Sequence, residues 1–175
     1  MGLSFNFVGV MEDVSGASHG EDVCGTDGCS IPTYAIPLRD LARGFARMAT
    51  GESLGSERSK AANRLLNACM NEPFYMAGSK RFCTDVMSLA PGEIFAKTGA
   101  EGVFCGAIPG LGLGIALKCD DGAVRASEAM MAATLAHILP PDHTAQAGLS
   151  DRLIKDVKTW NRNSVGTIKA DLRRV

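Results

Sequence analysis

The chain has 175 residues, with 18 Lys and Arg against 19 Asp and Glu, and 46% of its residues are hydrophobic. This length suits one domain with its own core, and the balanced charge argues against a nucleic-acid partner, which would call for a basic face. No apolar run approaches the ~20 residues of a transmembrane helix, and the N-terminus lacks the basic flank and cleavage site of a signal peptide. We therefore expect a single cytoplasmic domain over residues 1–175, with no nucleic-acid and no membrane partner.

The first third of the chain is predicted to hold a loop over residues 12–30, an extended stretch between Pro32 and Pro37, and a helix from Leu38 to Gly51. Arginines 39, 43 and 47 recur along that helix at four-residue intervals, which predicts a solvent-exposed stripe. A second helix is predicted to begin at Ser56 and to stop before Pro73.

Helices and strands are both predicted in the rest of the chain. The predicted elements are an irregular piece over 73–81, a helix over 84–89, a β-hairpin at about 94–119, a helix over 127–139 and a strand over 165–170. The hairpin turns at Pro109-Gly110-Leu111-Gly112, and Asp120-Asp121-Gly122 ends it.

The six cysteines are expected to be free thiols, because no secretion signal accompanies them and several fall on helix or strand patterns. No Cys-x-x-Cys pair occurs, which excludes a self-contained zinc finger. Cys24 and Cys29 lie five apart in a glycine-rich loop, which leaves room for one of them to join a site assembled from elsewhere.

A Lys97-Thr98-Gly99 box stands at the start of the predicted hairpin. In enzymes that acylate a serine, such a box lines the active site. Its lysine supplies a fixed positive charge, its small residue a hydroxyl, and its glycine lets a substrate lie against the strand backbone. Taken alone, the tripeptide also fits a surface lysine at the end of a strand.

Four ordered segments resemble a serine-dependent bacterial L-asparaginase family: residues 24–38, 77–85, 97–102 and 116–126. The first contains Asp27-Gly28-Cys29, and the third begins with the Lys97 box. The resemblance implies an α+β fold like that of β-lactamases and glutaminases, with an antiparallel sheet flanked by helices. Since the family is about twice as long, the chain is expected to be an incomplete, C-terminal portion of that fold, with residues 1–10 unmatched.

The resemblance also implies roles for particular residues. Lys97 would be a catalytic lysine, and Asp27, Thr98, Gly99 and Glu101 would contact an amide substrate. Cys29 would be a metal ligand, so the resemblance implies zinc, although the ligand set in this chain is incomplete. Two roles stay open for Glu101, which could cap the strand end or position Lys97 by a charge-assisted bond.

The sequence departs from the family at the nucleophile. No Ser or Thr stands three residues before any lysine, so the Ser-x-x-Lys motif is absent. We therefore expect an asparaginase-type amidohydrolase that needs a complementary N-terminal half, or that self-associates to cover its apolar faces. Two alternatives are an inactive fragment acting as an oligomeric binding module, and a relative of the penicillin-binding proteins and β-lactamases.

Overall fold

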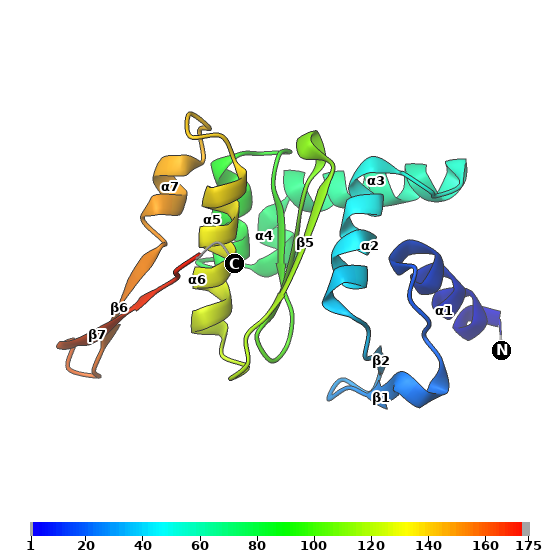
Figure 1. Ribbon diagram of the computed structural model, residues 1–175, viewed down its shortest axis with the longest axis horizontal. Coiled ribbons are helices and arrows are strands. Elements are labelled where there is room, and N and C mark those ends of the chain that lie inside the picture. The colour runs from blue at the N-terminus through cyan, green and yellow to red at the C-terminus, as the bar shows by residue number, and fades with distance from the viewer. Residues whose placement is uncertain (1, 173–175) are drawn as a thin grey trace. The chain divides into compact units, whose positions relative to one another are not determined.

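A computed structural model describes residues 2–172, with side chains described for residues 7–172. Helices and small antiparallel sheets make up the chain (Figure 1), which confirms the predicted α+β class. Met1, at the start that the resemblance leaves unmatched, lies outside the described residues. Within the described part of the chain, no helix is long and apolar enough to cross a lipid bilayer.

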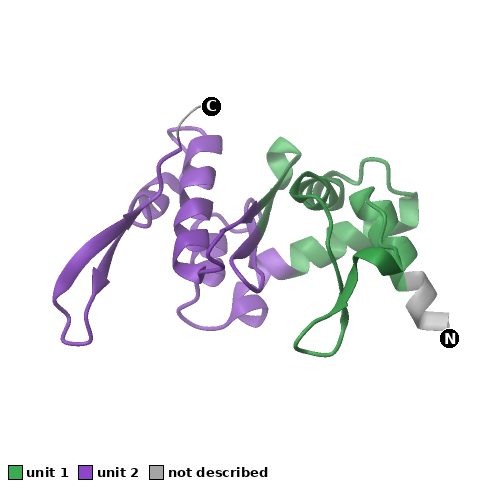
Figure 2. Cartoon of the chain, turned by 60° about the horizontal axis from the view of Figure 1, so that its bottom comes forward, with its two compact units in different colours: residues 1–68, 105–116 green, residues 69–104, 117–175 purple. Residues whose placement is uncertain are grey.

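The chain divides into two compact units (Figure 2). Unit 1 comprises the described residues through Ala68 together with Cys105–Ala116, and unit 2 comprises Cys69–Phe104 together with the described residues from Leu117 onward. A three-stranded sheet has the order β3-β4-β5, formed by Phe95–Thr98, Val103–Ile108 and Leu113–Lys118. The predicted hairpin is therefore confirmed, with a short 3-10 turn (η2, Pro109–Leu111) between β4 and β5.

Unit 1 contains three helices and a short hairpin. Its elements are α1 (Gly2–Ser15), η1 (Glu21–Val23), β1 (Cys24–Thr26), β2 (Pro32–Tyr34), α2 (Leu38–Thr50) and most of α3 (Ser56–Asn71). The prediction of a loop over 12–30 was wrong at two points. Helix α1 continues to Ser15, and β1 pairs with β2 so that Cys24 lies opposite Tyr34. Helix α2 ends as predicted, because Gly51 adopts the left-handed conformation with φ of 75°.

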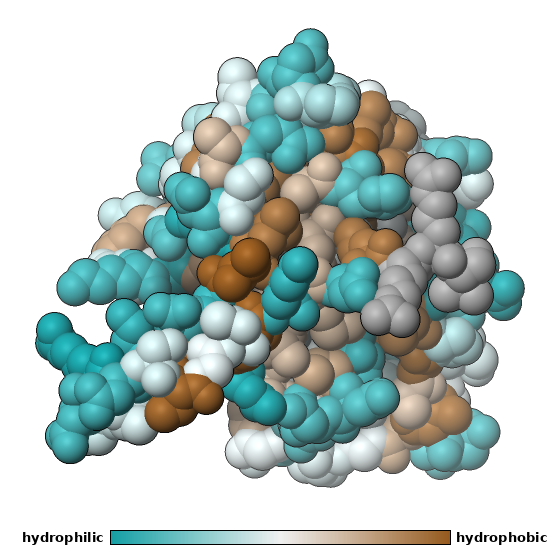
Figure 3. Space-filling model, turned by 60° about the vertical axis from the view of Figure 1, so that its left-hand side comes forward, coloured by the Kyte–Doolittle hydropathy of each residue, from teal (hydrophilic) through white to brown (hydrophobic). Residues whose placement is uncertain are grey.

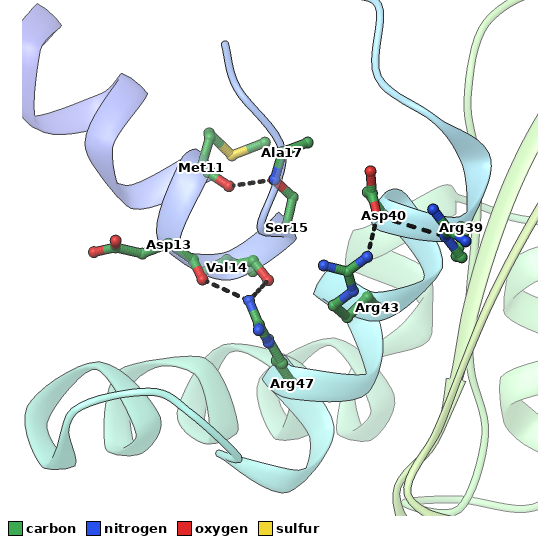
Figure 4. A network of polar contacts seen from close by, with 9 residues as sticks. All are labelled: Met11, Asp13, Val14, Ser15, Ala17, Arg39, Asp40, Arg43 and Arg47. Carbon is green, nitrogen blue, oxygen red and sulfur yellow. Dashed lines mark hydrogen bonds and ion pairs between the residues drawn. The ribbon is translucent and has the colours of Figure 1, made fainter.

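Two of the three arginines of α2, Arg43 and Arg47, do not lie in a solvated stripe as the sequence predicts, whereas Arg39 is exposed as predicted (Figure 4). Arg47 Nη1 donates to the carbonyl oxygens of Asp13, at 3.0 Å, and Val14, at 3.4 Å. These carbonyls belong to the last turn of α1, where the helix leaves them without partners of its own. Arg43 forms an ion pair with Asp40, which is only 8% exposed. This difference from the predicted stripe has a physical cause, because the end of α1 supplies hydrogen-bond acceptors that helical periodicity alone does not reveal.

Strand β5 carries a glycine at a close approach to α2 within unit 1. A Cβ atom built on Gly114 would overlap the carbonyl oxygen of Ala42 and the amide nitrogen of Ala46. Both are backbone atoms, so no side chain can rotate away to make room. Only glycine fits at this point of the strand.

Unit 2 packs α5 (Phe82–Leu89) against β3. Its remaining elements are α4 (Pro73–Ala77), α6 (Val124–Ile138), α7 (Gln146–Ser150), β6 (Ile154–Lys158) and β7 (Ser164–Lys169). Its fully buried side chains include Val86, Met87, Ile94, Phe104 and Met131. Helices α5 and α6 begin two and three residues earlier than predicted, whereas α4, α7 and β6 were not predicted.

Strands β6 and β7 form an antiparallel ribbon with nearly every residue exposed. The turn of this ribbon carries Trp160, whose side chain is fully exposed. Strand β7 confirms the predicted final strand. Because the ribbon buries almost no apolar surface of its own, its hydrophobic side chains are free to contact another surface.

Candidate functional site

The Lys97 box lies where β3 ends and a tight turn begins. The turn is closed by two bonds, from the Gly99 amide to the Val103 carbonyl at 2.8 Å and from the Val103 amide to the Ala100 carbonyl at 3.1 Å. Gly102 has a φ of 74°, and a Cβ there would lie 2.9 Å from the Cβ of Cys119. Glycine at 102 therefore lets the turn sit directly against the segment that follows β5.

Lys97 presents its ammonium group at the end of the strand. Phe95 and Ala96 are buried, whereas the Lys97 side chain is exposed. Its Nζ donates to the carbonyl oxygen of Thr98 at 2.7 Å, and Thr98 Oγ1 donates to the carbonyl oxygen of Gly99 at 3.3 Å. The box thus gathers an ammonium, a hydroxyl and a glycine backbone within three residues.

Glu101 does not hold Lys97. Its backbone adopts a φ of 51°, and its carbonyl oxygen accepts a hydrogen bond from Lys118 Nζ at 2.7 Å. Of the two roles that the sequence left open, the bond from Glu101 to Lys97 is not formed in the structure. Glu101 instead contributes its backbone to the turn.

The buried thiol of Cys83 contacts the backbone of the Lys97 box. Sequence reasoning did not single this residue out. The Thr98 amide donates to Cys83 Sγ at 3.3 Å, and Cys83 is 2% exposed. Burial raises the pKa of the Cys83 thiol, while the Thr98 amide and the charges of Lys97 and Arg81 partly oppose that rise. The group is therefore a neutral hydrogen-bond acceptor at neutral pH. Its place in the segment over 77–85 that resembles the asparaginase family was the available signal.

Asp121 organises the turn that follows β5. Its carboxylate accepts hydrogen bonds from the Cys119 thiol and the Ala123 amide, each at 2.8 Å, and pairs with Arg125 at 2.7 Å. These contacts, the thiol bond first, lower the pKa of Asp121 to about 2. Asp121 and Arg125 thus act as turn and helix-start residues.

Asp27 and Cys29 lie in the loop between β1 and β2, in unit 1. Asp27 Oδ1 accepts the Gly28 amide at 2.8 Å, and the Cys29 thiol donates to Asp27 Oδ2 at 3.3 Å. Both residues are exposed. The aspartate carboxylate therefore fixes the loop and orients the thiol.

The zinc that the resemblance implies does not fit the donors of this chain alone. Among residues 7–172, no three His, Cys, Asp or Glu side chains gather as a metal site requires. Cys29 and Asp27 supply two donors, and further ligands would have to come from another polypeptide.

The structure brings four of the predicted site residues together. Lys97, Thr98, Gly99 and Glu101 share β3 and its turn in unit 2, whereas Asp27 and Cys29 form a separate pair in unit 1. No disulfide joins cysteines within the part of the chain that the structure describes.

Comparison with known proteins identifies the chain. The family model of L-asparaginase II matches residues 5–170, nearly the whole sequence. The chain therefore belongs to the L-asparaginase II family. No curated protein matches it.

Proposed function

We propose that the chain forms part of an amidohydrolase that converts L-asparagine and water to L-aspartate and ammonia. The observation that carries this proposal is the Lys97 box, exposed at the end of β3 in a chain of the L-asparaginase II family. The substrate class is a small-molecule amide. The finer fold assignment, a portion of a β-lactamase-like or glutaminase-like fold, belongs to the same proposal.

The box suits the wall of an acyl-transfer site. A serine that attacks the side-chain amide carbon places negative charge on the carbonyl oxygen, and a fixed ammonium stabilises such charge. Lys97 supplies that ammonium. Thr98 offers a hydroxyl to the substrate, and Gly99 removes the side chain that would keep a substrate away from the strand. Ammonia leaves with the proton that the base removed from the serine hydroxyl, and water then hydrolyses the acylated serine to release aspartate.

The attacking serine is proposed to come from a second polypeptide segment. A serine hydroxyl needs a base such as the lysine of Ser-x-x-Lys to become a nucleophile, and this sequence lacks that motif. Loss of the nucleophile from a catalytic unit costs on the order of 10⁶ in rate. The chain alone is therefore expected to be inactive.

The test is ammonia release from L-asparagine, measured for the chain alone and for the chain mixed with a separately expressed Ser-x-x-Lys half of an L-asparaginase II family protein. The proposal predicts release only in the mixture, above the rate of the added half alone. Equal release by the chain alone would show that it has a nucleophile of its own, and would refute the proposal that a second polypeptide segment supplies the serine.

A second candidate function is an oligomeric binding module without chemistry. The exposed β6–β7 ribbon favours it, because Ile154, Trp160 and Val165 are more than half exposed there. Sedimentation velocity distinguishes self-association through the ribbon from a monomer. Stable dimers that remain inactive with the added half would favour this module.

A further inference from the structure

Unit 2 contains a hollow of about 600 Å³ that the Lys97 box does not use. Three segments line it: the start of α5, the start of α6 and the start of β6. Figure 3 views the molecule from the side of the β6–β7 ribbon, where hydrophilic residues surround scattered apolar ones. A cavity of this volume is in the range that holds small organic ligands.

Positive charge exceeds negative charge around this hollow. Its cationic lining residues are Lys80, Arg81, Arg125, Arg152 and Lys155. Its three carboxylates are those of Asp85, Glu128 and Asp151. The lining therefore carries two more positive than negative charges.

The carboxylates are mostly occupied by cations that also line the hollow. Asp85 pairs with Arg152 at 3.4 Å, and Glu128 pairs with Lys155 at 3.7 Å. In the described chain no ion pair is formed by Lys80 or Arg81, which adjoin each other at the start of α5. Arg125 pairs with Asp121. Lys80 and Arg81 therefore remain for a ligand, and Asp151 is the one lining carboxylate that forms no ion pair in the described chain.

Backbone donors at the same place add to this charge. Helix α5 begins after Arg81 and α6 begins after Ala123, and neither N-cap residue forms a side-chain capping bond. Helix α6 also has no acidic residue in its first turn. The first turn of α5 carries Asp85, so it is the first amides of α6 that add partial positive charge to the cationic lining.

Apolar side chains lie between the charged ones. Phe82, Val124 and Ile154 all line the hollow. They would contact the carbon skeleton of a ligand whose charged ends meet the lysines and arginines. A free inorganic ion would leave this apolar surface uncovered.

We propose that this hollow binds a small organic dianion, whose charge is carried by a phosphate ester or by a pair of carboxylates. Arg81 would donate to the anionic group as a two-pronged guanidinium. Lys80, which adjoins Arg81, would add a second positive charge. The proposal requires no hydrolytic activity and stands apart from the function assigned to the Lys97 box.

The test is isothermal titration calorimetry of the full chain at low ionic strength with two probes, glycerol 3-phosphate and succinate. We expect one-to-one binding of at least one probe with a Kd of about 1 mM or tighter. The tighter probe identifies the source of the charge, phosphate ester or dicarboxylate. Arg81→Gln should weaken binding roughly tenfold or more, because a charge-assisted bond is lost.

The matched control is Arg64→Gln, an exposed arginine of α3 that lies outside the hollow. It should leave the Kd within about twofold of the wild type. Lys80→Gln, at an exposed lysine just before α5, provides a second variant whose fold should be unaffected, and it should also weaken binding. Absence of saturable binding by both probes would overturn the proposal, as would equal weakening by Arg64→Gln and Lys80→Gln.

Discussion

Replacement of Cys83 by alanine tests whether the buried thiol supports the Lys97 box. Cys83 is 2% exposed, and its sulfur accepts a hydrogen bond from the Thr98 amide at 3.3 Å. Removing one buried sulfur loses about 1 kcal/mol of burial, and the amide left without an acceptor costs about 1–3 kcal/mol. We therefore expect the free energy of unfolding to fall by about 2–4 kcal/mol, a large part of the roughly 5–15 kcal/mol typical of a domain.

Urea denaturation of Cys83→Ala and Cys83→Ser measures this loss. Serine keeps an acceptor for the Thr98 amide, so Cys83→Ser should be destabilised less than the alanine variant. The matched control is Cys69→Ala, a partly exposed cysteine of α3, which should change stability by no more than about 0.5 kcal/mol. If Cys83→Ala loses no more stability than Cys69→Ala, the thiol does not support the strand as argued.

Three further predictions concern packing, pH and thiol chemistry. Gly114→Ala should lower the free energy of unfolding by about 3 kcal/mol or more in urea denaturation, because the added Cβ meets the backbone of α2. Gly166→Ala is the control, since the space around Gly166 is open. Equal stability of the two variants would contradict this prediction. Asp121 has a folded pKa of about 2, below its usual 3.8, so its stabilisation is complete above about pH 4 and is lost as pH falls toward 2. Acid unfolding of Asp121→Asn should therefore depend less steeply on pH than that of the wild type, and parallel curves would exclude the role. Iodoacetamide should alkylate the exposed Cys24 and Cys29 before the buried thiols, as mass spectrometry can follow; simultaneous labelling would indicate that the core opens readily.

Local sequence pattern was sufficient for one helix and for a β-hairpin. Helix α2, with its stop at Gly51, and the β4–β5 hairpin follow from local pattern and turn glycines. The ribbon strand β6 escaped prediction because it buries no face and so has no alternation for the pattern to reveal. Likewise, the last turn of α1 depends on Arg47, which lies more than 30 residues away in the chain.

The candidate site divides in the same way. The Lys97 box and its place on a strand were predictable, because its three residues are consecutive in the sequence. Cys83 was not, since its role depends on α5 packing beneath β3, a contact between residues 15 apart. The role of Glu101 also depends on tertiary structure. Lys118 donates a hydrogen bond to its backbone carbonyl, and its carboxylate forms no ion pair with Lys97.

The most direct test of the central claim is the effect of Lys97→Ala on kcat/KM for L-asparagine in the mixture with the Ser-x-x-Lys half. Lys60→Ala serves as the control, since Lys60 is an exposed lysine of α3 that pairs only with Glu57 at the surface. Loss of a charge that stabilises the transition state should lower kcat/KM by about 100-fold or more, with Lys60→Ala close to the wild type. A Lys97→Ala variant as active as Lys60→Ala would contradict the claim that this chain supplies a catalytic lysine.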